Sequence, residues 1–142
     1  MRRVVLDTNV TISAFFWGGH PRTIYNLIQD RNLIMLISKD IENEFIRVMG
    51  YSKFAVSSKE ILPFIRNLRS SAEFTKTSSK ISAITADPTD NIFLECAVDG
   101  RADYIISGDR HLLDLGTYNG IAILKAKDFL IKEGYLPENT PS

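Results

Sequence analysis

The feature that most constrains the fold is a set of four short apolar runs in which polar and hydrophobic residues do not alternate. These runs are Arg3–Leu6, Leu33–Ile37, Tyr104–Ser107 and Ile121–Leu124. Runs of this kind are typical of strands buried on both faces, as in a parallel sheet. A weaker run, Ala72–Thr77, predicts one further short strand. With helical patterns between the runs, the order predicts an α/β fold: a single-domain three-layer sandwich with a mostly parallel central sheet.

Helix signals occupy the gaps between these runs. The apolar segment Val10–Trp17 ends at a Gly-Gly pair, and Pro21 suits the first turn of a helix that follows. Ser38 is a suitable N-cap for the next helix, which Gly50 ends. These positions predict that a helix follows each of the first two strands.

Later helices have weaker start signals. Ser57 and Glu60 form a capping box, and Pro63 inside the helix predicts a kink or a later start. Thr89 is expected to cap a helix over Asp90–Val98. A short helix is predicted over Lys127–Lys132. Together these signals give an α/β domain over residues 1–136 and a frayed tail over residues 137–142.

Composition fits an ordinary globular domain of 142 residues, with 44% hydrophobic and 24% charged residues. The single cysteine, Cys96, excludes an internal disulfide and fits a reducing compartment. No apolar run reaches the length of a membrane span. Asp7 interrupts the apolar stretch at the N-terminus, which is therefore not read as a signal peptide. We expect a cytoplasmic protein with no membrane partner.

The formal net charge is zero. Proteins that bind nucleic acid through phosphates usually carry a basic excess, so this balance counts modestly against general nucleic-acid binding. A local basic patch beside an acidic centre would give the same sum. Net charge alone therefore leaves a nucleic-acid substrate open.

Acidic residues follow the predicted strands. Asp7 comes directly after the first run, and Asp109 lies just past the run Tyr104–Ser107. Asp90 lies in the first turn of a predicted helix, where the preceding loop would bring it to the same edge. Because ligand sites in α/β folds form at the carboxyl ends of strands, these three acids are expected to meet at one edge of the sheet.

Glu44 is a fourth candidate because it shares one helical strip with Ile41 and Val48. That strip is expected to face the protein, where a carboxylate needs water, a cationic partner or a metal ion. No lysine or arginine partner is predicted for Glu44. His20 and His111 are interpreted as isolated, which leaves no histidine and cysteine spacing for zinc.

Four carboxylates in one place repel one another unless a divalent cation lies between them. Oxygen ligands favour a hard cation, Mg²⁺ or Mn²⁺, and such a centre suits phosphodiester hydrolysis because the ion lowers the pKa of a bound water. Hydrogen-bonding side chains are expected to support the centre; they are Thr8, Asn9, Asn91 and Ser107. Asp87 is a further nearby acid, although an aspartate before proline is more often a turn residue. Arg110 is a candidate phosphate contact.

Four segments, in order, resemble the motifs of PIN domains. They are Val5–Val10 (VLDTNV), Ser38–Phe45 (SKDIENEF), Asp87–Asn91 (DPTDN) and Asp103–Leu113 (DYIISGDRHLL). The resemblance implies that Glu44, Asp90 and Asp109 are metal ligands together with Asp7. His111 departs from the family pattern, because an acid often stands there.

The whole pattern, which includes the last strand and helix, is similar to the prokaryotic PIN branch of VapC-type toxins in toxin–antitoxin pairs. That resemblance implies cleavage of RNA with Mg²⁺ or Mn²⁺, a homodimer and an antitoxin protein as partner.

Two other functions are weighed against this one. The first is a PIN-like binding module with weak or no catalysis, against which the complete set of four acids argues. The second is a phosphatase of the aspartyl-phosphate kind, which needs a second aspartate two residues after the nucleophile. That position is Asn9, which disfavours the phosphatase.

Overall fold

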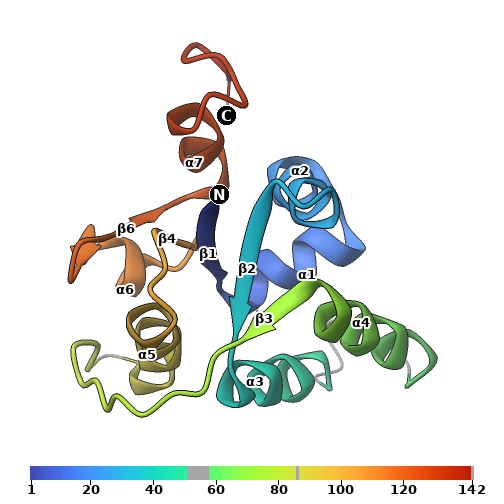
Figure 1. The fold of residues 1–142 in the computed structure, drawn as a ribbon, viewed down its shortest axis with the longest axis vertical. Helices are drawn as coiled ribbons and strands as arrows, with labels where there is room; N and C mark the ends of the chain where they lie inside the picture. Colours follow the sequence, from blue (N-terminus) through green and yellow to red (C-terminus); the bar gives the residue numbers. More distant parts are fainter. Residues whose placement is uncertain (51–57, 86, 142) are drawn as a thin grey trace.

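A computed structural model describes residues 1–50, 58–85 and 87–141 of the chain. Within these residues the chain forms a six-stranded sheet in the order β3-β2-β1-β4-β6-β5 (Figure 1). The strands are β1 (Arg2–Leu6), β2 (Leu33–Ile37), β3 (Ala72–Phe74), β4 (Tyr104–Ile106), β5 (Thr117–Tyr118) and β6 (Ile121–Leu124). All neighbours pair in parallel except β5 and β6. The predicted α/β fold with a mostly parallel sheet is confirmed.

Helices cover both faces of this sheet (Figure 1). They are α1 (Thr8–Phe16), α2 (Gly19–Gln29), α3 (Lys39–Met49), α4 (Ser58–Ser71), α5 (Asn91–Asp99), α6 (Arg110–Leu113) and α7 (Ala126–Lys132). α5 packs against β1, β2 and β4, and α6 packs against β6. On the opposite face, α2 packs against β2 and α7. The result is the predicted three-layer arrangement, and the described part of the chain contains no helix that could span a bilayer.

The buried strands explain why the apolar runs lack polar alternation. Val4, Val5, Ile105 and Ile106 are fully buried, because helices cover them on both faces. Burying a side chain of this size contributes about 1.5–3 kcal/mol. Cys96 is also fully buried in α5, which confirms that it behaves as a small hydrophobic residue.

Several local predictions hold and others need correction. Ser38 caps α3, since its hydroxyl oxygen accepts the Ile41 N–H at 3.2 Å, and Gly50 is the C-cap. α4 begins at Ser58 and continues through Pro63, so a later start is wrong. The proposed capping residue Ser57 lies outside the described residues.

The start of α5 differs from the prediction because a turn of 3₁₀ helix, η2 (Pro88–Asp90), precedes it. Asp87, and not Thr89, is the cap: its carboxylate accepts the Thr89 N–H at 3.3 Å and the Thr89 hydroxyl at 2.5 Å. Proline fixes a backbone angle that suits the first turn of a helix, so the chain turns two residues earlier than expected.

The strand order places a switch point between β1 and β4. From β1 the chain proceeds through β2 to β3 on one side, whereas β4 leads to β6 and β5 on the other. Leu6 pairs with Ile106 at the carboxyl ends of these two strands. In open α/β sheets, ligands bind at such a point because the connecting loops diverge there. The residues after Leu6 and Ile106 therefore face a natural site.

Candidate metal centre

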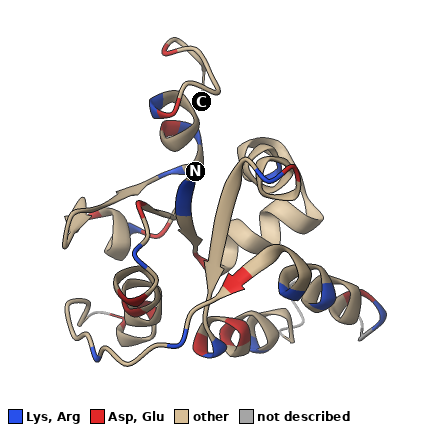
Figure 2. Ribbon diagram, in the orientation of Figure 1, with Lys and Arg blue, Asp and Glu red and all other residues tan. Residues whose placement is uncertain are grey.

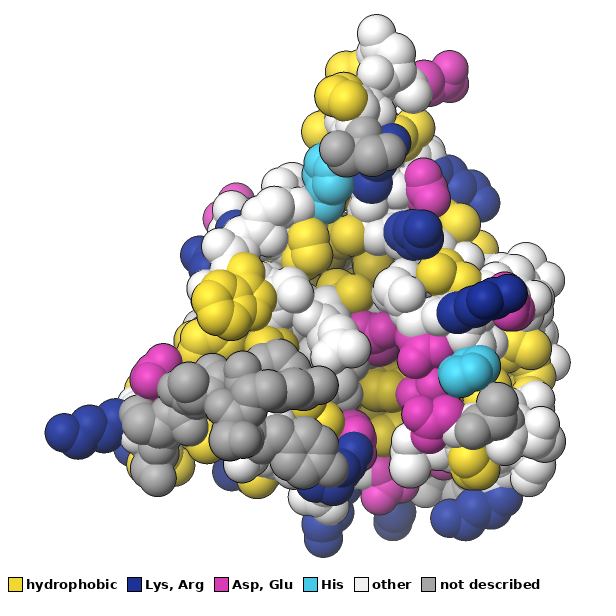
Figure 3. Space-filling model, turned by 180° about the vertical axis from the view of Figure 1, so that it is seen from behind, with side chains coloured by type: hydrophobic (Ala, Val, Ile, Leu, Met, Phe, Trp, Pro, Cys, Tyr) yellow, Lys and Arg dark blue, Asp and Glu magenta, His cyan; other side chains and the backbone are white. Residues whose placement is uncertain are grey.

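A cleft of about 270 Å³ opens at the carboxyl ends of β1 and β4. Its lining residues are Asp7, Thr8, Asn9, Glu44, Arg47, Val48, Asp87, Thr89, Asp90, Phe93 and Asp109. Figure 3 shows acidic side chains gathered around a partly hydrophobic floor on this face of the molecule. The four acids predicted from the sequence thus come together in one cleft, with Asp87 as a fifth.

Asp7 is the most deeply buried of these acids, at 4% exposure. It is the N-cap of α1, where one carboxylate oxygen accepts the Val10 N–H at 2.8 Å. The other oxygen accepts the hydroxyl of Ser107, which follows β4. Burial raises the pKa of Asp7, although these two hydrogen bonds oppose the rise. Ser107 also accepts the Asp109 N–H at 2.9 Å and so joins the two strand ends.

Asp90 has the strongest electrostatic conflict in the cleft. Burial first, and then the charges of Asp109 and Asp87, raise the pKa of Asp90 to about 7. Its Oδ2 atom is buried without a hydrogen-bond partner, a condition shared within the described residues only by Thr8 Oγ1. A buried carboxylate oxygen of this kind is costly unless a cation neutralises it.

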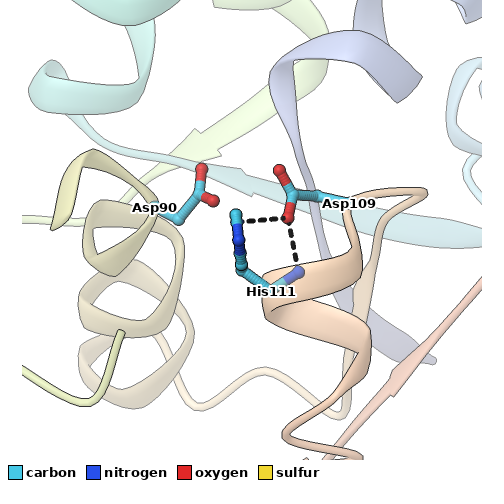
Figure 4. Close-up of side chains that lie close together, drawn as sticks. All are labelled: Asp90, Asp109 and His111. Carbon is cyan, nitrogen blue, oxygen red and sulfur yellow. Dashed lines mark hydrogen bonds and ion pairs between the residues drawn. The ribbon is translucent and has the colours of Figure 1, made fainter. Parts of the chain in front are cut away.

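Asp109 and His111 lie beside Asp90. Asp109 caps α6, and its Oδ1 atom accepts the His111 N–H at 2.7 Å. The imidazole Nδ1 of His111 is 3.4 Å from the same oxygen. One ligand atom from each of Asp90, Asp109 and His111 lies within 4.8 Å of the others (Figure 4).

The interpretation of His111 as isolated was therefore wrong. The physical reason is α6, which was not predicted: its first turn folds His111 back over the aspartate that caps it. His20, in contrast, does not line the acidic cleft. It lies in a separate groove that adjoins the cleft.

Glu44 faces the cleft from α3, and its side chain is 16% exposed. The expectation that it lacks a basic partner was wrong. Arg47, one turn later on the same helix, donates from Nε at 3.1 Å and from Nη2 at 2.5 Å to the two carboxylate oxygens. The spacing of three residues was a readable signal for this pair. Glu44 is outside the group of three close ligand residues, so its charge is balanced first by Arg47.

One predicted supporting residue, Asn91, and one candidate phosphate contact, Arg110, are not among the residues that line the cleft. The side-chain oxygen of Asn91 accepts the Ile84 N–H at 2.9 Å, and its NH₂ group donates to the Ile84 carbonyl at 2.8 Å. Asn91 thereby holds the segment that precedes η2. Arg110 has a side chain that is 90% exposed and lies 3.7 Å from Asp114, not among the cleft residues. Thr8 and Asn9 do line the cleft, as predicted.

A groove of about 430 Å³ adjoins the acidic cleft. Val10, His20 and Pro21 line one side, and Lys125 to Asp128 line the other. Ser107 and Gly108 form the boundary between this groove and the loop that carries Asp109. Lys125 and Lys127 therefore line this second groove although the whole chain has no net charge.

The cleft residues fit a divalent cation. The partnerless oxygen of Asp90 and the raised pKa values of Asp7 and Asp90 indicate carboxylates that lack a counter-charge. Carboxylate oxygens are preferred by hard cations such as Mg²⁺ and Mn²⁺. Such an ion, when bound, would supply a water of lowered pKa and stabilise charge on a phosphoryl group.

Comparisons with known proteins agree with this architecture. A search of curated proteins found no match. Among solved structures, the chain is similar to VapBC2 from Rickettsia felis bound to a DNA fragment from their promoter, with 12% sequence identity and a TM-score of 0.54. The similarity covers 85% of this chain and 96% of that one, and it concerns the fold. The sequence pattern of the PIN domain matches residues 3–111, and with this match over most of its length the chain belongs to the PIN-domain family.

Proposed function

We propose that this protein is an endoribonuclease that hydrolyses RNA phosphodiester bonds with Mg²⁺ or Mn²⁺. The observation that carries the proposal is the meeting of Asp7, Glu44, Asp90 and Asp109 in one cleft, where a buried oxygen of Asp90 has no partner. Membership of the PIN-domain family supports a hydrolase acting on nucleic acid.

In this proposal, the four acids hold the cation and the surrounding residues hold the acids. Asp7 is fixed by Val10 and Ser107, and Asp109 is fixed by Ser107 and by the first turn of α6. Asp90 has the fewest restraints, since its side chain makes no cap hydrogen bond to α5. Ser107 is accordingly a positioning residue, because it joins the acids of two strands without needing to touch the substrate.

RNA is proposed as the substrate because the groove next to the acidic cleft is lined in part by Lys125, a side chain that can bind a phosphate. Lys and Arg are interspersed with Asp and Glu on the helices (Figure 2), in line with the net charge of zero. We further propose a cytoplasmic toxin that forms a homodimer and is inhibited by an antitoxin protein. The support for this role is the fold shared with VapBC2, together with the resemblance of the sequence motifs to VapC-type toxins.

The proposal is tested by cleavage of a mixed RNA pool in the presence of Mg²⁺ or Mn²⁺. Cleavage is expected to stop with EDTA, and to return when the cation is restored.

Asp109→Asn keeps a side chain that can cap α6 but removes a proposed ligand. It is expected to lower kcat by at least about 100-fold, since even outer-shell partners of a metal are worth 10–100-fold. Asp114→Asn, an exposed acid outside the cleft, is the matched control. Undiminished cleavage by Asp109→Asn, or cleavage in EDTA, would refute the proposal.

One observation favours a second candidate, a PIN-like binding module with weak catalysis. Arg47 already binds both carboxylate oxygens of Glu44, so this acid must exchange a partner before it can serve as a ligand. Calorimetry with Mn²⁺ separates the candidates, because a binding module would take up no cation at millimolar concentration. Arg47→Gln is expected to strengthen Mn²⁺ binding if Glu44 is a ligand, and to leave it unchanged if Glu44 is not.

A further inference from the structure

Within the described residues, His111 is the one histidine in the close group of possible metal ligands, and it therefore offers that group a nitrogen ligand. Its imidazole lies between the carboxyl groups of Asp90 and Asp109 (Figure 4). The other histidine of the chain, His20, lines the adjoining groove instead. The close set of ligand atoms is therefore mixed, with oxygen from two acids and nitrogen from one imidazole.

The backbone fixes where the imidazole can reach. Asp109 caps α6 by accepting the His111 N–H at 2.7 Å, so residue 111 is held one short turn from the carboxylate. The imidazole Nδ1 is 3.4 Å from the oxygen that accepts this hydrogen bond. The His111 side chain is 46% exposed, which leaves the ring able to turn toward a ligand without repacking of the core.

The donor set has a consequence for the choice of cation. Mg²⁺ favours oxygen ligands and octahedral geometry, whereas an imidazole nitrogen suits first-row transition ions. Mn²⁺ accepts carboxylates as Mg²⁺ does. Because Mn²⁺ is a first-row transition ion, it also accepts an imidazole nitrogen more readily than Mg²⁺ does. A site with Asp90, Asp109 and His111 is thus expected to favour Mn²⁺ over Mg²⁺ more strongly than an all-carboxylate site would.

We propose that an imidazole nitrogen of His111 coordinates the cation beside Asp90 and Asp109, and that His111 thereby makes the centre select Mn²⁺ over Mg²⁺. This inference rests on the metal centre of the proposed function. It goes further, because it names a ligand that is not an acid and assigns the selectivity of the centre to that residue.

The experiment compares wild type, His111→Asn and His111→Asp, none of which alters the backbone hydrogen bond to Asp109. Calorimetry gives the Kd for Mn²⁺ and for Mg²⁺, and pulsed electron paramagnetic resonance of bound Mn²⁺ reports coupling to a ligand ¹⁴N nucleus. Wild type is expected to show nitrogen coupling. His111→Asn is expected to lose it and to weaken Mn²⁺ binding by about 10-fold or more, with a change below about 3-fold for Mg²⁺.

His111→Asp tests the same idea in the opposite direction, because it restores a carboxylate. The ratio of the two Kd values is expected to shift toward Mg²⁺. His20→Asn is the matched control and is expected to keep the wild-type nitrogen signal, since His20 lies in the other groove. Circular dichroism checks that each variant is folded.

The outcomes separate this inference from the proposed function. If wild type binds Mn²⁺ without nitrogen coupling, or if His111→Asn leaves the ratio of Kd values unchanged, the inference is overturned while RNA cleavage can still stand. If neither ion binds to the wild-type protein, the metal centre itself is absent and both fail.

Discussion

Replacement of Asp90 by asparagine is expected to stabilise the cation-free protein. Asp90 makes no side-chain cap to α5, and its Oδ2 atom is buried without a partner, so the substitution removes no helix cap. What it removes is a carboxylate placed beside Asp109, Asp87 and Asp7. The expected gain is the free energy now lost when Asp90 ionises in the folded state.

The magnitude follows from the pKa of Asp90, which rises from an ordinary value near 3.8 to about 7. A shift of that size corresponds to roughly 4 kcal/mol if the carboxylate is fully desolvated. The group is half-buried, and solvent screening reduces this to about 1–2 kcal/mol. The N-terminus of α5 favours a negative charge by about 0.3–1 kcal/mol, which places the net gain near the lower figure.

The sign of the pH dependence is fixed by the direction of the shift. Between about pH 4 and pH 7, the folded protein holds the Asp90 proton and the unfolded chain does not. Stability therefore falls as the pH rises through this window, and the penalty is complete above pH 7. Asp90→Asn removes the penalty, so its advantage over wild type is largest at pH 8, smaller at pH 5 and absent near pH 4.

Urea unfolding in EDTA at pH 8 and pH 5 measures this effect, with Asp114→Asn as the control for loss of an exposed charge. A gain of 1 kcal/mol corresponds to roughly 3–4 °C in Tm for a domain of this size. Addition of Mn²⁺ at 100 times its Kd should stabilise wild type by about 2.7 kcal/mol and Asp90→Asn by less. The reasoning is refuted if the difference between the two proteins is the same at both pH values, or if Asp90→Asn is less stable at pH 8.

Two further substitutions test individual contacts within the fold, one at the cleft and one at a close approach to α5. Ser107→Ala leaves the buried Asp7 carboxylate and the Asp109 N–H each short of one hydrogen-bond partner. Urea unfolding is expected to show a loss of stability of about 1–3 kcal/mol. A loss under about 0.5 kcal/mol would contradict the role of Ser107 in joining the two aspartates. Gly100→Ala would place a Cβ 2.7 Å from Thr75 Oγ1 and is expected to lower Tm by the equivalent of about 1–3 kcal/mol. Gly50→Ala, whose Cβ would meet nothing nearer than 3.4 Å, is its control, and equal losses in both would count against the steric argument.

The sheet was predictable where burial alone specifies a strand. β1, β2 and β6 are continuous apolar runs, and helices cover them as the pattern indicates. β5 was missed because it has only two residues, and its pairing with β6 depends on the turn between them. Asn119 and Gly120 both have positive φ there, at 50° and 79°, and an Asn-Gly pair is a hairpin signal that the sequence did contain.

The site was predictable to the extent that topology determines it. Asp7 and Asp109 follow strands that end side by side, so the strand pattern was enough to bring them together. His111 depends on α6, a helix of four residues that is too short to leave a periodic pattern. The pairing of Glu44 with Arg47 could be predicted from their spacing of three residues on one helix. The position of Glu44 relative to the other acids could not be predicted, because it depends on how α3 packs against α1 and α5.

Three aspartates of the cleft both cap a helical turn and carry negative charge in the cleft. Asp7, Asp87 and Asp109 each accept a backbone N–H at the start of a helical turn, at 2.8, 3.3 and 2.7 Å. Asparagine caps a helix about as well as aspartate, while alanine in that place costs about 0.5–2 kcal/mol. At these three positions an asparagine variant reports on charge and an alanine variant on charge and folding together. Asp90 and Glu44 accept no such backbone bond among the contacts described for the cleft, and Glu44 is instead hydrogen-bonded to Arg47. Replacement of Asp90 therefore changes the charge of the cleft without removing a cap, and its effects on stability and on cation binding both report that charge.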